Sequence, residues 1–460
     1  MNTAPSAGTP PLAGVPRLGA RTWWAVVVVG LVGQIAWTIE NMYLNLFVYE
    51  RISPQPAVIA VMVAVSAVAA TVAAMLVGAW SDRVGRRRPF VAIGYVVWGL
   101  LTAAFGLFAG DDGGASAAVA GVGFAVAGII ALDAVMSIFG AGANDGAFNA
   151  WVTDSTVPAN RGRVDGVLSV FPLLSMLLVF GVLDPLTQAG NWVGFFGIVG
   201  AVTSLAGVAA WFLMDDRGVP ARDAPPLRAI LDELRPAAVR ANPVLYVTLA
   251  IMAALGIASQ VFLPYLIIYL QRFLAVPYAV VLGVVLIVAS VLTMVGGRVM
   301  DRVGKDPYFL PVVALFAVGL LVFWVARDLG FVILAGIVAM TGMLSCNATV
   351  AAMVRDATPL DRAGVIQGLR MIALVLVPMV IGPAIGAAVI SGAGQTYEDL
   401  GVVKPVPGPE IFPVAAAVLV VSVPVLWWWR RRLLLRAVSG DRDVSASLAG
   451  RHRSSGRSQP

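Results

Sequence analysis

Twelve apolar segments constrain this chain more than any other feature of its sequence. Each is close to the ~20 residues that an α-helix needs to cross the hydrocarbon layer of a membrane. Only helices and closed β-barrels satisfy their backbone polar groups inside that layer, and the sequence lacks the alternating segments of about ten residues that a barrel would show. The predicted spans are residues 22–49, 56–79, 89–109, 118–153, 165–183, 192–214, 243–271, 277–298, 307–326, 330–354, 365–393 and 411–433.

The composition agrees with an integral membrane protein. Charged residues make up 12% of the chain, whereas soluble proteins carry roughly a quarter. The first apolar segment is too long for the core of a signal peptide and no small-residue cleavage site follows it, so we predict that it is retained as a span. Residues 1–21, rich in Pro, Gly and Ala, are predicted to form a disordered tail.

A long polar stretch between the sixth and seventh spans divides the chain into two sets of six. The predicted units are an N-terminal bundle (22–214), a linker (215–241), a C-terminal bundle (242–435) and a basic tail (436–460). Residues Leu227–Ala237 of the linker are amphipathic enough for a short surface helix. The expected fold is an all-α membrane protein with twelve transmembrane helices in two pseudo-symmetric six-helix bundles around a central cavity.

Arginine and lysine side chains gather in alternate connections, in the linker and near both ends of the chain. By the positive-inside rule, both termini and the linker are predicted to be cytoplasmic. This topology accounts for the formal net charge of +6 without a nucleic-acid partner. We expect a monomer in the cell membrane, with the lipid bilayer and a small-molecule substrate as its partners.

Several classes of chemistry are excluded by what the sequence lacks. The single cysteine, Cys346, lies in a predicted span, and the single histidine, His452, lies in the C-terminal tail. An internal disulfide and a histidine-based catalytic or metal site in the membrane are therefore excluded. The chain has no nucleophile–base pair and no phosphate-binding glycine loop. It is not expected to be an enzyme or an ATP-driven pump, and no cofactor is expected beyond a coupling H⁺ or Na⁺.

Two pairs of matching segments indicate an internal duplication. The stretch "GAWSDRVGRRRPF" (78–90) has the same Gly, Asp-Arg and Gly spacing as "GRVMDRVGKDPYF" (297–309). The stretch "DSTVPANRGRVDG" (154–166) shares Asp, Thr, Pro, Arg and Gly, in order, with "DATPLDRAGVIQG" (356–368). Two halves around a binding site at their interface are a recurrent plan of secondary transporters.

These motifs resemble those of major facilitator superfamily secondary transporters. The first copy of the signature comprises Gly78, Asp82, Arg83, Gly85, Arg86 and Arg87, and the weaker copy comprises Gly297, Asp301, Arg302, Gly304 and Lys305. The resemblance implies that Asp82 and Arg83, and the equivalent Asp301 and Arg302, lock the cytoplasmic ends of the two halves together. The stretches "GQIAWTIENMYLNLFVYE" and "NDGAFNAWVTD" are similar to glycoside-pentoside-hexuronide and sucrose-type sugar carriers.

The signature also has a physical interpretation of its own. Gly78 and Gly85 permit close approach of helix ends, and Asp82 can face a helix N-terminus or an arginine. The arginines meet lipid phosphates or a partner carboxylate, or serve topology alone. The predicted gating residues also include, from the second repeated pair, Asp154, Arg161, Asp356 and Arg362. Arg370, five residues into the eleventh span, is either a snorkelling end residue or a cavity cation that pairs with Asp82 or an anionic substrate.

Polar residues of the first span suggest one wall of a cavity. Gln34, Thr38, Asn41 and Asn45 fall on one helical stripe, and Glu40 lies next to Asn41. Trp37 is placed one turn before Glu40, where it can stack on a ligand ring or simply pack.

The fourth span offers a second set of polar residues. Asp133, Ser137 and Asn144 share one face, and Asp145 and Asn149 share a neighbouring face. By the repeat, Asn347 of the tenth span corresponds to Asp145. Glu40 and Asp145 are the candidates for a carboxylate that binds H⁺ or Na⁺, the alternative being a structural hydrogen bond between helices. Asp133 is expected near the outer surface.

We therefore expect a secondary active transporter that moves a small polar solute by alternating access, coupled to H⁺ or Na⁺. A sugar or glycoside is the favoured substrate. Two alternatives remain open, a drug or metabolite efflux antiporter of the same superfamily and a non-transporting membrane receptor.

Overall fold

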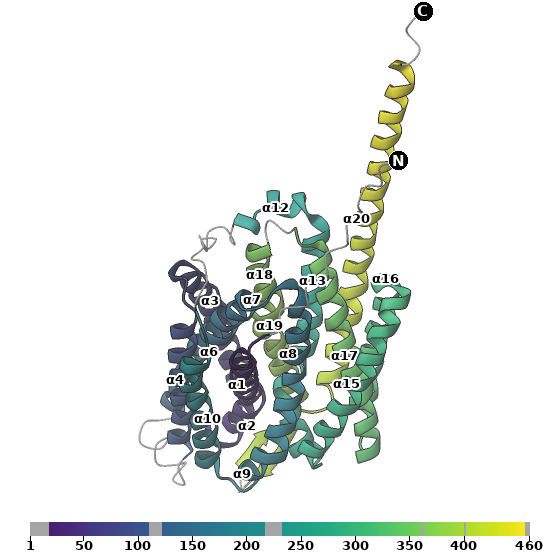
Figure 1. The fold of residues 1–460 in the computed structure, drawn as a ribbon. Helices are drawn as coiled ribbons and strands as arrows, with labels where there is room; N and C mark the ends of the chain where they lie inside the picture. Colours follow the sequence, from purple (N-terminus) through teal and green to yellow (C-terminus); the bar gives the residue numbers. More distant parts are fainter. Residues whose placement is uncertain (1–17, 110–121, 217–231, 360–362, 400–401, 456–460) are drawn as a thin grey trace, which may run out of the picture.

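The computed structural model describes residues 18–109, 122–216, 232–359, 363–399 and 402–455. Within this part of the chain, twelve helical segments are long and apolar enough to cross a membrane. The prediction of an all-α membrane protein is confirmed, apart from one short β-hairpin (Figure 1).

The N-terminal half contains the first six spans. The first consists of α1 (Ala20–Thr38), η1 (Ile39–Tyr43), α2 (Leu44–Phe47) and η2 (Val48–Ile52). The second is α3 (Pro56–Val84), and the third is α4 (Arg88–Ala104) with η3 (Phe105–Phe108). The fourth consists of α6 (Val122–Ala141), η4 (Gly142–Phe148) and α7 (Asn149–Asp154). The fifth consists of α8 (Pro158–Leu178), η5 (Val179–Leu183) and α9 (Asp184–Gln188), and the sixth is α10 (Trp192–Leu213).

The C-terminal half follows the short linker helix α12 (Pro236–Ala241). Its first span consists of α13 (Pro243–Gln260), η6 (Leu263–Tyr265), α14 (Leu266–Ile268) and η7 (Tyr269–Phe273). The next three are α15 (Tyr278–Val303), α16 (Lys305–Val325) and α17 (Leu329–Ala357). The eleventh span consists of α18 (Ala363–Met371), η9 (Ile372–Leu376) and α19 (Val377–Ala393), and the last lies in α20 (Ile411–Ser455).

Each half packs mainly within itself. In the N-terminal half, α4 packs against α10 and α3 packs against α6, whereas in the C-terminal half α16 packs against α17 and α13 packs against α20. The purple and blue half and the green and yellow half therefore stand side by side (Figure 1). In the described chain, the largest contact between the halves is that of α3 with α19.

We call inner the end of the molecule at which α3 ends and α4 begins, and outer the opposite end, which carries the hairpin. The hairpin pairs β1 (Thr396–Asp399) with β2 (Val402–Pro405) in antiparallel register, Thr396 opposite Pro405. It joins the eleventh and twelfth spans at the same end of the molecule as α9 (Figure 1). At the inner end, α20 continues beyond the apolar span to Ser455.

Several spans contain π-helical turns, namely the first, fourth, fifth, seventh and eleventh. A π-turn inserts one residue into the α-helical repeat, so side chains after it face a different direction from the one that a 3.6-residue period predicts. Hydropathy gives no sign of these turns, and the sequence did not predict them.

Several span boundaries differ from the sequence prediction, among them the start of the fifth span. The fifth span begins at Pro158 instead of residue 165, because its first turns are polar and carry no hydropathy signal. Most of the predicted surface helix (227–237) lies outside the described residues, and Asp232 and Glu233 within it are helical. The short helix α12 follows and begins at Pro236, where the proline suits the first helical turn.

Candidate functional site

A cavity of about 240 Å³ lies between the two halves. The N-terminal half lines it with Trp37, Glu40, Asn41, Ser66, Ala67, Ala70 and Asp145, and the C-terminal half lines it with Met371, Val375 and Met379. The first, second and fourth spans therefore build a mixed wall that carries all the polar side chains of the lining, and the eleventh span builds an apolar wall.

Three π-turns surround this cavity. Glu40 and Asn41 lie in η1, Asp145 lies in η4, and Val375 lies in η9. Such turns recur at functional sites because they displace side chains and backbone from the regular helical ladder. Their meeting at one cavity between the halves marks this place as the candidate functional site.

Glu40 is held by the fourth span. The Ser137 hydroxyl donates to Glu40 Oε1 at 2.7 Å and also lies 2.9 Å from the Asp133 carbonyl oxygen. Glu40 Oε2 is buried without a hydrogen-bond partner in the described part of the chain. Glu40 is only 7% exposed although it lines the cavity.

Asp133 is buried in the N-terminal half, so its expected position near the outer surface is wrong. It is 1% exposed, because α6 turns this face toward α3 and the first span. Ser66 of α3 is its hydrogen-bonding neighbour. Its Oδ1 atom is another buried oxygen for which the described chain supplies no hydrogen bond.

Asp145 is anchored by a short polar chain. Its Oδ1 accepts from Asn144 Nδ2 at 2.8 Å, and the Tyr95 hydroxyl lies 2.8 Å from Asn144 Oδ1. Gly33 of α1 is required beside this chain, since a Cβ atom there would lie 2.7 Å from Asn144 Oδ1. Asn149, one turn later, is exposed and bonds the Asp145 carbonyl at 3.4 Å instead of reaching the cavity.

The polar stripe predicted for the first span is not continuous. Asn41 lines the cavity, but Thr38 is buried against Ser175 of α8, with 3.0 Å between the hydroxyl oxygens. Asn45 is buried and donates to the Asn41 carbonyl at 2.8 Å, and Gln34 does not line the cavity. The cause is η1, which changes the helical period between Thr38 and Asn45.

Trp37 lines the cavity and rests on Trp98 of α4, with ring centroids 5.4 Å apart. The predicted counterpart of Asp145 in the tenth span, Asn347, is exposed and does not line this cavity. The two halves therefore contribute unequal walls at this level.

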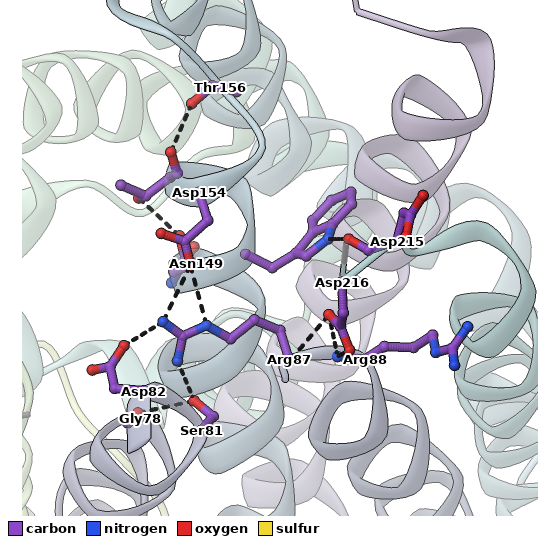
Figure 2. A network of polar contacts seen from close by, with 12 residues as sticks. Gly78, Ser81, Asp82, Arg87, Arg88, Asn149, Asp154, Thr156, Asp215 and Asp216 are labelled. Carbon is purple, nitrogen blue, oxygen red and sulfur yellow. Dashed lines mark hydrogen bonds and ion pairs between the residues drawn. The ribbon is translucent and has the colours of Figure 1, made fainter. Parts of the chain in front are cut away.

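At the inner end, the signature between α3 and α4 forms a polar network around Arg87 (Figure 2). Arg87 is 1% exposed. Its guanidinium pairs with Asp82, donates to Ser81 Oγ at 2.6 Å and lies 3.2 Å from Asp154 Oδ2 of α7. The carboxylate of Asp216 accepts from the backbone N–H groups of Arg87 and Arg88 at 3.0 and 3.1 Å, which caps α4.

The glycines of the signature adopt special positions. Gly85 ends α3 with φ 65°, a left-handed conformation that turns the chain back under the helix end. Gly78 lies against the backbone of Gly146 in η4. Arg83 and Arg86 are exposed, so Arg87, and not Arg83, is the arginine that holds Asp82.

The second copy of the signature is looser. Asp301 and Arg302 are exposed, and a Cβ atom built on Gly297 would meet no atom within 4 Å. Lys305 pairs with Asp356 at the end of α17, as Arg87 pairs with Asp154 at the end of α7. Each half therefore has a cation that binds an aspartate at the end of its fourth span, although Lys305 aligns with Arg86 and not with Arg87.

Three further predicted gating residues have distinct positions. Arg161 donates to the Thr153 and Thr156 carbonyls at 3.1 and 3.3 Å and closes the turn between α7 and α8. Arg362 lies outside the described residues. Arg370 is half-buried in α18 without an ion pair to Asp82, and its Nε has no hydrogen-bond partner in the part of the chain that the structure describes.

The sequence did not predict the polar contacts that join the halves at the outer end. Arg272 of η7 pairs with Glu50 of η2 at 2.6 Å. Buried Asp184 of α9 accepts from Tyr43 at 2.8 Å and from Tyr278 of α15. Asp184 follows an apolar run directly, and this signal was lost because the fifth span was predicted to end at residue 183.

Two tyrosines add further contacts at the outer end. The Tyr49 hydroxyl donates to the Pro405 carbonyl of the hairpin at 2.7 Å. The Tyr265 hydroxyl lies 3.2 Å from the carbonyl oxygen of Pro56, the first residue of α3. The outer end is therefore closed over the cavity by contacts from both halves.

Comparison with known proteins places these features in context. The model of the Major Facilitator Superfamily matches residues 26–289 and 274–455. No protein of curated function matches the sequence.

Several solved structures share the fold. The nucleoside transporter NupG is 12% identical over 88% of this chain and 98% of its own, with a TM-score of 0.68. An occupied, inward-facing bacterial homologue of the human lysosomal transporter Spinster is 15% identical over 91% and 98%, with a TM-score of 0.68. The xylose transporter XylE from E. coli, partially occluded and inward open, is 13% identical over 89% and 98%, with a TM-score of 0.61.

Proposed function

Because the chain belongs to the Major Facilitator Superfamily of membrane transporters, we propose that it moves a small polar solute by alternating access, coupled to H⁺ or Na⁺. The cavity between the halves carries this proposal, since it places Glu40 and Asp145 at the interface about which such halves rock. A charged side chain within a span costs about 2.5–3.5 kcal/mol on insertion scales. Two carboxylates at one cavity therefore raise the free energy of the membrane-inserted protein. A functional role explains why both are present.

The size and walls of the cavity favour a small hydroxylated ring. Its volume of about 240 Å³ lies below the ~300–1,000 Å³ of pockets for drug-sized ligands. Trp37 offers an aromatic face on which a sugar ring stacks, while Glu40, Asn41 and Asp145 offer acceptors and donors for hydroxyl groups. A sugar or glycoside is the first substrate class, in keeping with the nucleoside and xylose named for two proteins of the same fold.

Because the outer end is closed, solute would enter the cavity from the inner end in this conformation. Contacts of Glu50 with Arg272 and of Asp184 with Tyr278 join the halves there. Gly166 and Gly297, on the inner parts of α8 and α15, face open space, with no atom within 4 Å of a Cβ built on either. We propose that the inner end faces the cytoplasm and that the protein is a monomer in the cell membrane, as the arginine-rich inner connections favour.

The inner network around Arg87 would hold helix ends of the N-terminal half together during transport. Arg87 ties the end of α3 to the end of α7 through Asp82 and Asp154, so the second and fourth spans move as one unit. Asp82, with 28% of its side chain exposed, remains accessible to the partner half when the inner ends approach.

One observation favours a second candidate, the efflux of lipophilic cations. Met371, Val375 and Met379 form an apolar wall opposite the two carboxylates, and methionine adapts to varied apolar ligands. A cation with an apolar body would satisfy both walls.

Exchange measurements separate these candidates. Proteoliposomes loaded with unlabelled solute are tested for uptake of the labelled form from a panel of sugars, glycosides, nucleosides and lipophilic cations. We expect exchange of a sugar or glycoside, and at least tenfold slower exchange after Trp37→Ala. Trp24→Ala, which truncates an exposed tryptophan of the same helix, is the matched control. Exchange of lipophilic cations alone would favour the second candidate, and exchange of nothing in the panel would contradict the proposal.

A further inference from the structure

Glu40 and Asp133 form a buried acidic pair behind the cavity. Ser137, one helical turn after Asp133 on α6, donates to Glu40, which places the two carboxyl groups on the same patch of the N-terminal half. The charge of Asp133 acts directly on Glu40. Both side chains are more than nine-tenths buried.

Each member of the pair has one oxygen that no described residue satisfies. Glu40 Oε2 and Asp133 Oδ1 are both without a hydrogen bond in the described chain. A buried acceptor left unpaired costs about 1–3 kcal/mol, and more when it is charged. Two such atoms in one acidic pair point to a missing donor.

The groups that face the pair do not supply that donor. Ser137 of α6 already bonds Glu40 Oε1, and Ser66 of α3 is the hydrogen-bonding neighbour of Asp133. The further charge that acts on Glu40 is Asp145 of η4, which has the same sign. No arginine or lysine side chain of the described residues is hydrogen bonded or ion paired to Glu40 or Asp133.

A single proton would resolve this arrangement. Two neighbouring carboxylates in a poorly solvated site do not both remain ionised. With one proton added, the O–H group of one acid can donate to the free oxygen of the other, so one hydrogen satisfies both unpaired atoms. The pair then carries one negative charge, supported by the two serine hydroxyls.

We propose that Glu40 and Asp133 share one exchangeable proton and are the coupling site of the transporter. This inference rests on the proposed function and narrows its coupling ion to H⁺. Glu40 lines the cavity, so the proton exchanges with the cavity through Glu40. Asp133 does not line the cavity and is buried behind Glu40. Asp145, half-buried and already bonded by Asn144, is left to bind the solute.

The oxygen count disfavours a divalent metal cation at the pair. Hard cations such as Ca²⁺ or Mg²⁺ collect about six or more oxygen ligands. Here two free carboxylate oxygens and two serine hydroxyls are available, and the described residues include no group of three acidic, histidine or cysteine side chains suited to a metal ion. This count does not address sodium, whose binding is the alternative outcome to be tested.

Infrared difference spectroscopy tests the pair without any solute. The purified full-length protein, in lipid nanodiscs with potassium as the only alkali cation, is titrated with pH. We expect one protonated-carboxyl band that shifts in D₂O and disappears as pH rises. Glu40→Gln and Asp133→Asn should each move its titration by at least one pH unit, and the double variant should abolish it. Asp184→Asn is the matched control, because the oxygens of this buried acid already accept from Tyr43, Thr187 and Gln188.

The outcomes separate this inference from the proposed function. A band that persists in the double variant, or that is absent from the unmodified protein, would overturn the shared proton. Loss of the band on adding sodium at constant pH would assign the site to sodium. If the band behaves as expected but no solute of the panel exchanges, the proposed function fails while the proton site stands. If solute exchanges and Asp133→Asn still accumulates it in a pH gradient, only the coupling role is lost.

Discussion

Arg272 of η7 and Glu50 of η2 form an ion pair, 2.6 Å between Nη2 and Oε1, that joins the two halves of the molecule at the outer end. The pair comes from the seventh and first spans, which the duplication makes equivalent. It lies over the cavity that η1 and η9 line from opposite halves. Its opening is therefore a direct readout of the motion by which the cavity would change sides.

Removal of this pair should loosen the outer end. Both side chains are partly exposed, so we expect Arg272→Gln to weaken closure by no more than about 1 kcal/mol, about fivefold in population. Spin labels at Gln55 and Glu398, in a chain whose single cysteine is replaced by Cys346→Ala, would report a larger fraction of long distances. Arg51→Gln is the control, because Arg51 bonds Gly190 within its own half. An equal change in both variants would mean that the pair does not hold the halves together.

Arg87 should be the most sensitive residue of the signature between α3 and α7. Its loss leaves Asp82 and Asp154 without their shared cation in a largely buried place. Breaking a buried pair in this way costs about 3–5 kcal/mol. We therefore expect Arg87→Met to lower the midpoint of thermal unfolding in detergent markedly.

Arg86→Met is the matched control, since Arg86 is exposed one residue earlier. It should change stability by no more than about 0.5 kcal/mol. If the two variants unfold at the same temperature, the network around Arg87 does not stabilise the inner end.

Gly146 should not tolerate a side chain. A Cβ atom there would lie 2.8 Å from the Ala74 carbonyl oxygen and 3.0 Å from the Gly78 amide nitrogen, both backbone atoms of α3. Gly146→Ala would therefore force α3 and η4 apart, at about 1–3 kcal/mol. Differential scanning fluorimetry should show a lower melting temperature.

Gly166→Ala makes the same chemical change on α8, where no atom lies within 4 Å. It should leave the melting temperature unchanged or raise it slightly, because alanine is favoured over glycine in a helix by about 0.5–1 kcal/mol. Equal destabilisation by both changes would rule out the close crossing as the cause.

The spans and the duplicated signature could be predicted from the sequence because both depend on local information. Hydropathy counts residues along one helix, and the spacing of Gly78, Asp82 and Gly85 is read directly from the chain. The pairing of Arg87 with Asp82 was missed because it depends on the left-handed turn at Gly85. This turn determines which of the four nearby arginines lies close to Asp82 at the end of α3.

The candidate site could be predicted only in part, for a different physical reason. Glu40, Asn41 and Asp145 were found because polar residues stand out in apolar spans. The burial of Asp133 and Thr38 depends on helical rotation, and the π-turns alter that rotation without any signal in composition. The link between Asp184 and Tyr278 joins separate halves, and no periodicity within one span reveals it.

Accumulation of a labelled sugar in proteoliposomes tests the central claim most directly. Uptake is measured with an imposed pH gradient, with an imposed sodium gradient and with neither, using the sugar that exchanges fastest. The account predicts accumulation above the external concentration with the pH gradient alone, and its loss in Asp133→Asn while exchange continues. Uptake that never exceeds the external concentration under any gradient would contradict it.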